Sequence, residues 1–363
     1  MRQWKKIRTY IILSLITILF LSGTGCANRM EKYSYEFMGT FDTMIQILGY
    51  AKNRDTFMEM AQKGQKKFEE LHQLFDIYHD YPGLNNIKTI NDKAGLEPVP
   101  VQKEILDVIS FSIDWYDKTG GSVNIALGPV LSIWHDYRDE GLADPEKARI
   151  PDLMLLKAAN EKADIHKIIL DRDKGTVFLT EIGMKLDLGA VAKGYTTELV
   201  TRELLGLGYD SFAISGGGNV RVAGSPKDGK RTKWSIGIQD PDGNEYIPNR
   251  DLLDTAYVAD TSVVTSGDYQ RYYVVDDQRI HHLIDPVTLM PAVHFRAVTV
   301  ITQDSGAADF LSSTLFLLPY EKSRALAEGL DGVEALWVMP DGEIRVTEGM
   351  KNILKSSGGS ANK

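Results

Sequence analysis

Apolar residues recur at helical spacing in several long stretches of the chain. In 54–78 they repeat every three or four residues, with polar residues between them, which predicts a long amphipathic helix. The apolar positions there are Phe57, Met60, Ala61, Phe68, Leu71, Leu74 and Phe75. The same period predicts further helices at 101–118, 153–163, 193–207, 307–318 and 322–329.

Strands are predicted where apolar and polar residues alternate. The segment 33–50 alternates well enough for a strand or a hairpin, and the charge-rich stretch 136–147 is interpreted as a loop. Shorter strands are expected at 167–170, 176–179, 211–214, 234–238, 262–266, 272–275, 281–284, 297–302, 335–339 and 344–346. Because runs of helices are separated from runs of strands, the pattern predicts an α+β protein rather than a doubly wound sheet.

The N-terminus has the pattern of a targeting segment. A cationic start precedes an apolar run at 10–21, which is shorter than the roughly 20 residues of a membrane-spanning helix. Small residues and then Cys26, the only cysteine, follow the run, which indicates a lipid-attachment site where the thiol becomes a thioether to diacylglycerol. The alternative is an ordinary secretory signal with an incidental cysteine. Gly23 stands where the bacterial lipobox usually has leucine.

These end segments set the expected organisation of the chain. Residues 1–25 are predicted to be a lipoprotein signal peptide, 26–32 a tether, 33–354 the folded part and 355–363 a disordered tail. A lipid on Cys26 would place the protein on the extracytoplasmic face of the cell membrane.

Composition restricts the partners of the 363-residue chain. Its formal charge is −9, and removal of the cationic signal segment makes the mature protein more acidic still. That charge argues against nucleic acid as a partner, because phosphate backbones bind basic surfaces. An anionic ligand must therefore be met locally, by a metal ion, a lysine or backbone amides. With a single cysteine, no structural disulfide is available.

The cluster from Asp187 to Tyr195 is the strongest candidate for a binding site. It is expected at a strand-to-helix turn, where the free N–H groups of a helix N-terminus favour anions. Gly189 and Gly194 allow close backbone approach, Lys193 adds a positive charge, and the Asp187 carboxylate can accept hydrogen bonds from a base or ribose. The alternative is an ordinary helix start capped by aspartate.

Two glycine-containing turns are less specific. The run Ser215-Gly-Gly-Gly-Asn219 follows a predicted strand and would serve equally as an anion-binding nest or as a plain tight turn. The run Ser266-Gly-Asp-Tyr-Gln-Arg271 combines a turn with an aromatic ring and a cation, which suits a ring or phosphate contact or a simple hairpin.

Two further clusters supply candidate chemistry. Asp309 and Ser313 are four apart in a predicted helix and share a face, so their oxygens suit Mg²⁺. A solvated aspartate and a serine bonded to its own helix are the alternative. His282, at a predicted strand end near Asp285, is a candidate general base or a structural histidine bonded to backbone.

Taken together, these motifs resemble the FAD:protein FMN transferase family, over nearly the whole mature chain and including Met38-Gly39-Thr40 near its start. The resemblance implies a single α+β domain, with mixed or antiparallel sheets and flanking helices. It also implies Mg²⁺-dependent transfer of FMN from FAD to a threonine of an acceptor protein, with release of AMP. From location and family, the acceptor is expected to be a membrane-associated redox protein.

The resemblance also implies roles for individual residues. FAD contacts are expected at Met38, Tyr78, Ser122, Val123, Asn124, Asp187, Lys193 and Asp285. Mg²⁺ ligands are expected at the Ala190 carbonyl and the side chains of Asp309 and Ser313, with a further carbonyl at Gly306. His282 falls where a base has been proposed, and Asp187 and Lys193 complete the expected catalytic set.

This chain departs from the family pattern at two positions. Asn124 stands where the family usually has aspartate, so one FAD contact loses its charge, and Ser313 stands where it usually has threonine, with Thr314 as an alternative ligand. Two other activities remain open from sequence. Water in place of threonine would give an FAD pyrophosphatase that releases FMN and AMP, and loss of catalysis would leave an FAD-binding lipoprotein.

Overall fold

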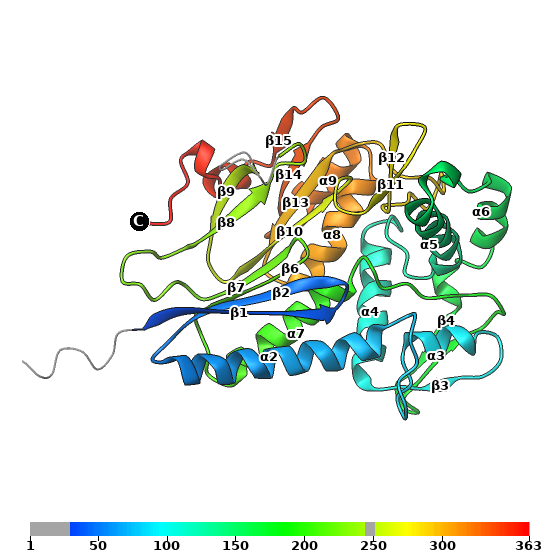
Figure 1. The fold of residues 1–363 in the computed structure, drawn as a ribbon, viewed down its shortest axis with the longest axis horizontal. Helices are drawn as coiled ribbons and strands as arrows, with labels where there is room; N and C mark the ends of the chain where they lie inside the picture. The colour runs from blue at the N-terminus through cyan, green and yellow to red at the C-terminus, as the bar shows by residue number, and fades with distance from the viewer. Residues whose placement is uncertain (1–29, 244–250, 363) are drawn as a thin grey trace, which may run out of the picture.

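A computed structural model of the protein describes residues 30–243 and 251–362. At its centre lies an eight-stranded sheet in the order β1-β2-β6-β7-β10-β13-β14-β15, in which all neighbouring strands are antiparallel (Figure 1). Its strands are β1 (Glu31–Thr40), β2 (Thr43–Ala51), β6 (Phe212–Gly216), β7 (Asn219–Ala223), β10 (Thr261–Gly267), β13 (Ala297–Thr302), β14 (Glu334–Val338) and β15 (Ile344–Val346).

Smaller sheets and the helices surround this sheet. The other strands are β3 (Val99–Pro100), β4 (Ile168–Asp171), β5 (Thr176–Leu179), β8 (Trp234–Gln239), β9 (Leu252–Val258), β11 (Tyr272–Val275) and β12 (Gln278–His281). The α-helices are α2 (Arg54–Phe75), α3 (Ile87–Asp92), α4 (Lys103–Lys118), α5 (Gly128–Ala143), α6 (Leu153–Asn160), α7 (Ala192–Gly206), α8 (Ser305–Leu317) and α9 (Tyr320–Gly329). This arrangement confirms the predicted α+β class.

Helices α2, α7 and α8 cover one face of the central sheet (Figure 1). Because side chains alternate along a strand, Val298 and Val300 of β13 point into the core under α8. Their neighbours Ala297 and Ile301 point to the opposite face. Helix α8 is buried along its whole length, so its polar residues are enclosed in the protein.

The opposite face of the sheet is covered by the β8–β9 hairpin and the C-terminal residues. The tail does not match the predicted disorder, because residues 355–362 are held by hydrogen bonds. Ser356 bonds to Asp254 of β9, and the Ala361 carbonyl accepts the N–H groups of Thr232 and Lys233, at 3.0 and 3.2 Å. Its small polar composition is that of a flexible segment, but these backbone and side-chain partners order it.

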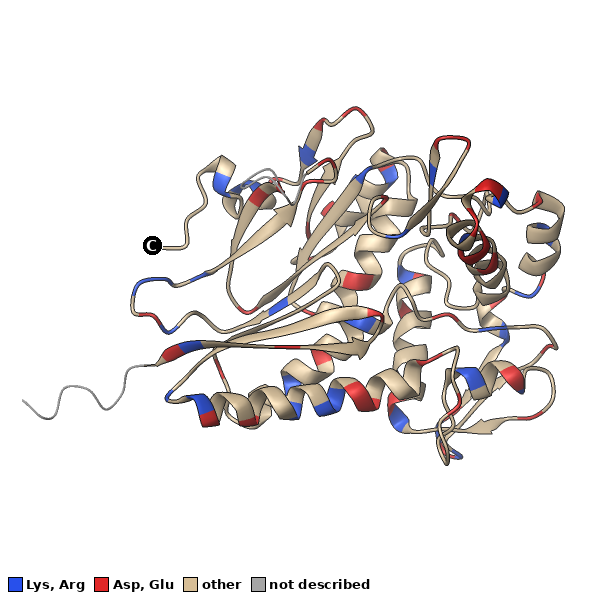
Figure 2. Ribbon diagram, in the orientation of Figure 1, with Lys and Arg blue, Asp and Glu red and all other residues tan. Residues whose placement is uncertain are grey.

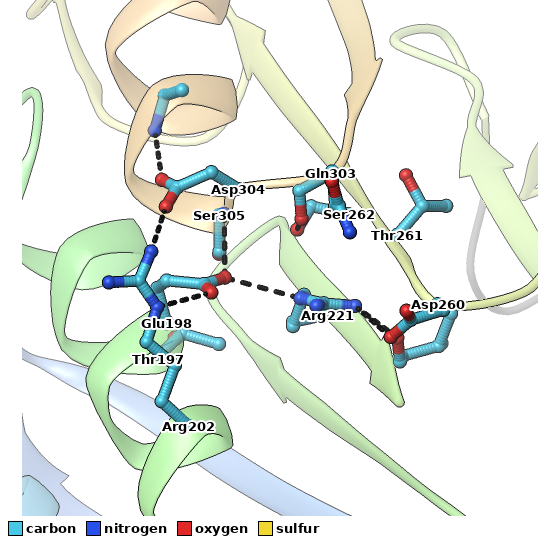
Figure 3. A network of polar contacts seen from close by, with 12 residues as sticks. Thr197, Glu198, Arg202, Arg221, Asp260, Thr261, Ser262, Gln303, Asp304 and Ser305 are labelled. Atoms are coloured by element: carbon cyan, nitrogen blue, oxygen red, sulfur yellow. Dashed lines mark hydrogen bonds and ion pairs between the residues drawn. The ribbon is translucent and has the colours of Figure 1, made fainter. Parts of the chain in front are cut away.

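Charged residues are interspersed along the outer helices (Figure 2). On α2, for example, lysines pair with glutamates three or four positions away. An ion network, buried at Glu198 and Arg221, joins the sheet to the helices (Figure 3). In it, Glu198 of α7 binds Arg202 at 2.9 Å and Arg221 of β7 at 3.2 Å, and Arg202 reaches Asp304, the N-cap of α8, at 2.7 Å.

The structure corrects several local predictions. The stretch 136–147, interpreted as a loop, mostly belongs to α5, whose start is set by Pro129 in its first turn and whose buried Val130 and Trp134 lie one turn apart. Strand β12 ends at His281, so His282 lies just beyond it. Strands β3, β7 and β9 and helix α3 were not predicted.

The predicted signal peptide and Cys26 lie outside the described residues. Within the described residues, no helix combines the length and the apolar character that crossing a membrane requires.

Candidate active site

The candidate site is built where the buried helices α7 and α8 pack against each other. On α8, Ser305, Asp309 and Ser313 are spaced by four residues and form one stripe. On α7, Gly194 and Glu198 are spaced in the same way. Glu198 accepts the N–H of Ser305 at 3.0 Å, and Asp309 accepts the N–H of Gly194 at 2.8 Å, so the two stripes run antiparallel.

Asp309 caps the start of α7 from the neighbouring helix. The N-cap residue of α7 is Val191, which has no side-chain oxygen to bind the free N–H groups of the first turn. Asp309 Oδ2 supplies that acceptor through its bond to Gly194. Burial raises the pKa of Asp309, while the positive Lys193 and the Gly194 N–H oppose the rise. The other oxygen, Oδ1, has no hydrogen-bond partner among the described residues.

This cap leaves further oxygen donors at the same end of α7. Because the Gly194 N–H goes to Asp309, no described backbone N–H bonds the carbonyl of Ala190, four residues earlier. Ser313 follows Asp309 by one turn of α8, and its hydroxyl lies 3.3 Å from that of Ser266 on β10. Backbone carbonyl, carboxylate and hydroxyl oxygens are the donor set that Mg²⁺ prefers. Among the described residues, no group of three or more His, Cys, Asp or Glu side chains is placed to hold a metal ion, so a cation here would depend on this mixed donor set.

Lys193 and Asp187 flank this end of the helix. Lys193 lies in the first turn of α7, where its charge acts on both Asp309 and His282. Its backbone N–H has no acceptor among the described residues, as is usual in the first turn of a helix, where such groups can bind an anion. Asp187 is buried, and its Oδ1 accepts the N–H of Gly189 at 2.8 Å, which fixes the turn into the helix.

The segment containing Ser122, Val123 and Asn124 runs beside Asp187. The Asp187 N–H donates to the Ile125 carbonyl at 2.8 Å, and Leu127 pairs with Lys185 as a short parallel bridge. The segment predicted to contact FAD is thus next to Asp187, whose carboxylate is also predicted to contact FAD. Asn124 itself is engaged by the backbone, since Nδ2 donates to the Ala163 carbonyl at 2.7 Å and Oδ1 accepts the Ala126 N–H at 2.8 Å.

Tyr78 meets this region from the end of α2. Its hydroxyl lies 3.1 Å from His135 Nδ1 on α5, and 55% of the residue is exposed. Burial of the hydroxyl and the charge of Asp187 raise the pKa of Tyr78 to about 12, so the phenol stays protonated. Burial lowers the pKa of His135, while Asp187 opposes this. Tyr78, His135 and Asp187 therefore form one neighbourhood.

His282 follows β12 and is held by the backbone of Arg271. Its Nδ1 lies 3.2 Å from the Arg271 carbonyl, which can only accept, so Nδ1 carries the proton and Nε2 the lone pair. Burial, together with the charges of Arg271 and Lys193, lowers the pKa of His282 to about 3. The imidazole is therefore neutral at pH 7 and has the form that a general base requires.

Sequence reasoning missed the residues of α5 that face His282. A recess is lined by His135, Arg138, His281 and His282, together with Leu131, Trp134, Tyr273 and Ile280. A sequence signal for this helix exists: Gly128-Pro129 followed by apolar residues one turn apart is typical of a helix start. The charge-rich sequence after Trp134 favoured a loop instead.

Four other predicted site residues are described by their local contacts or exposure. Gly306 packs against Tyr195 and Phe111, one turn of α8 before Asp309. The Thr314 hydroxyl donates to the Phe310 carbonyl at 2.9 Å, so its proton is bound within its own helix. Asp285 binds the Val287 N–H and the Thr288 hydroxyl, so it stabilises its own turn. Met38, 76% exposed, lies near the tip of the β1–β2 hairpin.

The triple glycine forms a tight turn, one of its two interpretations from sequence. Gly217 and Gly218 have φ of +53° and +85° and join β6 to β7 as a two-residue hairpin loop, a conformation that side chains other than glycine seldom adopt. The loop places Asn219 at the first position of β7.

Similarity to known proteins extends over most of the chain. The ApbE family model matches residues 38–337. The FAD:protein FMN transferase of Treponema pallidum (strain Nichols) is 34% identical over 350 residues, which are 92% of this chain and 93% of that protein. A protein of the same name from Klebsiella pneumoniae (strain 342) is 31% identical over 322 residues, 87% of this chain and 92% of that protein.

Solved structures show the same fold. The ApbE protein from Thermotoga maritima superposes with a TM-score of 0.76 at 27% identity, covering 89% of this chain and 99% of that one. The flavin transferase ApbE from Vibrio cholerae gives 0.71 at 22% identity, with 90% and 100% covered. Together with the match of the family model, these similarities show that the chain belongs to the ApbE family.

Proposed function

We propose that this protein is an FAD:protein FMN transferase, which moves FMN from FAD to a threonine of an acceptor protein. In this reaction the threonine oxygen forms a bond to the FMN phosphorus, the bond to the bridging oxygen breaks, and AMP leaves. The similarity to two proteins of that name, above 30% identity, supports the activity. The observation that carries the assignment is the bond from the Gly194 N–H to Asp309 at the start of α7, beside Lys193, whose charge also acts on His282.

The first turn of α7 is suited to hold the diphosphate of FAD. Lys193 offers an ammonium group and a free backbone N–H, and the helix dipole adds partial positive charge at the same end. Tyr78, Asp187 and the segment 122–124 lie beside this turn and would contact the rest of the dinucleotide. In an acidic protein, this local concentration of donors is what attracts an anion.

The oxygen donors at this end fit Mg²⁺ as a cofactor. Asp309 Oδ1, the Ala190 carbonyl and the Ser313 hydroxyl would hold it, and Ser313 offers the same oxygen as the usual threonine. When bound there, the ion would neutralise charge on the phosphate oxygens. The raised pKa of the buried Asp309 carboxyl is consistent with a group that needs a cation to stay ionised.

His282 is suited to accept the threonine proton at Nε2. In the free protein the charges of Arg271 and Lys193 help to keep its pKa at about 3, which makes it a weak base. An anionic diphosphate beside Lys193 offsets part of that charge and raises the proton affinity of His282. Its basicity would therefore increase when FAD is bound.

The decisive test is Asp309→Ala, assayed with FAD, Mg²⁺ and an acceptor fragment that carries a threonine. Loss of this ligand should reduce Mg²⁺-dependent transfer by about 10²–10³-fold, comparable to the loss of one main electrostatic contact to a transition state. Mass spectrometry of the acceptor for an FMN adduct on threonine, and AMP release, are the readouts. Exposed Asp277→Ala is the matched control.

Two outcomes would contradict the proposal. Undiminished transfer by Asp309→Ala would remove the cation site. AMP release by the unaltered protein that is equally fast without the acceptor, with no adduct, would identify an FAD pyrophosphatase instead.

We also propose that the protein is anchored through a lipid on Cys26 and acts on membrane-associated redox proteins outside the cytoplasm. Its support is the N-terminal pattern, with a short apolar run that ends at the only cysteine. Strand β1 begins at Glu31, five residues after Cys26, so an extended connection would span roughly 17 Å. The domain would then stay close to the membrane surface.

A further inference from the structure

Asn219 is a buried amide that the proposed chemistry does not use. It begins β7 directly after the glycine turn and is completely buried. Its Oδ1 accepts the Ser305 hydroxyl proton at 2.8 Å. Its Nδ2 has no hydrogen-bond partner among the described residues. A buried donor without a partner is destabilising, so a residue that keeps one at this position requires an explanation.

The amide packs directly against Gly194. A Cβ atom at Gly194 would lie 2.8 Å from Asn219 Nδ2, 2.4 Å from Asp309 Cβ and 2.3 Å from the Ser305 carbonyl oxygen. The amide, the stem of the carboxylate and the backbone of α8 thus meet α7 at one point. That point is also where the Gly194 N–H binds Asp309.

Strand β7 therefore holds α7 and α8 at two successive levels. Asn219 and Arg221 are two residues apart and point to the same face of the sheet. Arg221 binds Glu198, which in turn accepts the Ser305 N–H (Figure 3). Asn219 binds the hydroxyl of the same Ser305 and abuts Gly194, which lies one turn of α7 before Glu198. The ion network fixes the interface at Glu198 and Ser305, and Asn219 fixes it at Gly194, where Asp309 binds.

We propose that Asn219 is a positioning residue for the cation-binding carboxylate of Asp309, an inference that rests on the proposed function. Its carbonyl sets the start of α8, and its NH₂ group sets how closely Gly194 approaches. Together they direct Asp309 so that Oδ2 caps α7 and Oδ1 is free for the cation. An aspartate here would keep the acceptor for Ser305 but add a second buried carboxylate on the same side of Gly194. The neutral amide avoids this.

The test is the rise in melting temperature caused by Mg²⁺ in the absence of FAD, a readout independent of activity. Asn219→Asp should melt below the wild type without Mg²⁺. Because the cation offsets the added charge, Mg²⁺ should raise its melting temperature by about 3 °C more than it raises that of the wild type. Asn219→Ala should need about tenfold more Mg²⁺ for half of the full shift, a change equal to one pKd unit.

The matched control is Ser305→Ala, which removes the same hydrogen bond but leaves the amide against Gly194. It should need less extra Mg²⁺ than Asn219→Ala does, because the amide still sets how closely Gly194 approaches. If Asn219→Asp folds only with Mg²⁺, that result supports the proposal. If Asn219→Ala does not fold, Asn219→Ser takes its place.

Two results would overturn the proposal, and they differ from each other. A wild-type Mg²⁺ shift that both Asn219 variants reproduce, or that Ser305→Ala disturbs as much as they do, would reject a positioning role while leaving the cation site intact. A wild type without any Mg²⁺ shift would reject the cation site of the proposed function and this proposal with it.

Discussion

Asn124 shows how a residue that departs from a family pattern can be bound on both sides of its amide by the backbone. Its NH₂ group donates to the Ala163 carbonyl, a bond that an aspartate lacks the proton to make. Its oxygen accepts the Ala126 N–H, as an aspartate also would. The asparagine thus fixes the turn that carries Val123 past Asp187, so here the amide has a structural role that sequence comparison alone presents as a lost charge.

His282 makes a prediction about stability and pH. Its pKa of about 3 lies below the ordinary histidine value near 6.5, so the unfolded chain binds the proton more readily than the folded protein. The stabilising contribution is complete above about pH 6.5 and decreases as the pH falls towards 3, by at most about 1.4 kcal/mol per pH unit.

The variant His282→Asn, which keeps a donor for the Arg271 carbonyl, should therefore lose less stability than the wild type between pH 7.5 and 5.5. Urea unfolding at the two pH values measures the difference. Part of the wild-type loss should persist in the variant, because burial also lowers the pKa of His135 and His281. Equal losses in both proteins would show that His282 is not protonated on unfolding.

At the scale of elements, the close contact of α7 and α8 depends on glycine in the first turn of α7. Any side chain at Gly194 would collide with α8 backbone and with Asp309, neither of which is the end of a flexible side chain. Gly206, at the last position of the same helix, has open space around it. Substitutions at these two positions of one helix therefore distinguish the effect of packing from the effect of helix propensity.

Gly194→Ala should destabilise the protein by about 3 kcal/mol or more, because overpacking forces the helices apart. Gly206→Ala should be neutral or stabilise by up to about 1 kcal/mol, since alanine favours helix over glycine. Chemical unfolding measures both free energies, and the Mg²⁺ dependence of AMP release should be lost only in Gly194→Ala. Similar stabilities for the two variants would mean that α7 and α8 can separate without cost.

At the scale of the whole molecule, the anchor and the active site are predicted to be independent. Cys26 precedes the first strand, whereas the site lies at the junction of α7, α8 and the sheet. Cys26→Ser should release the protein from membranes while it still modifies a soluble acceptor fragment at the wild-type rate. Asp309→Ala should show the reverse, with membrane association kept and transfer lost.

Membrane fractionation and mass spectrometry of the N-terminal peptide for diacylglycerol test the anchor. A Cys26→Ser protein that remains in the membrane fraction would argue for an uncleaved N-terminal segment or a protein partner as the anchor.

The α+β class, most of the helices and strands, and the chemical character of the main clusters could be predicted from the sequence alone. These follow from local patterns, such as the apolar period of α2, the alternation in β13 and the four-residue spacing of Asp309 and Ser313. Local composition gave wrong predictions for two segments whose structure depends on tertiary contacts. The charged residues of 136–147 suggested a loop where most of the segment belongs to α5. The small polar residues of 355–362 suggested disorder, although they bond to β9 and to the loop before β8.

Which clusters meet and which atoms are free depends on how the folded chain packs. That Asp309 caps α7 depends on two helices more than a hundred residues apart in sequence approaching at Gly194. The same contact frees the Ala190 carbonyl, while Thr314 and Asp285 satisfy their oxygens locally. Sequence shows which donors and acceptors exist, but hydrogen bonding in a buried site depends on distances that the packed fold alone sets.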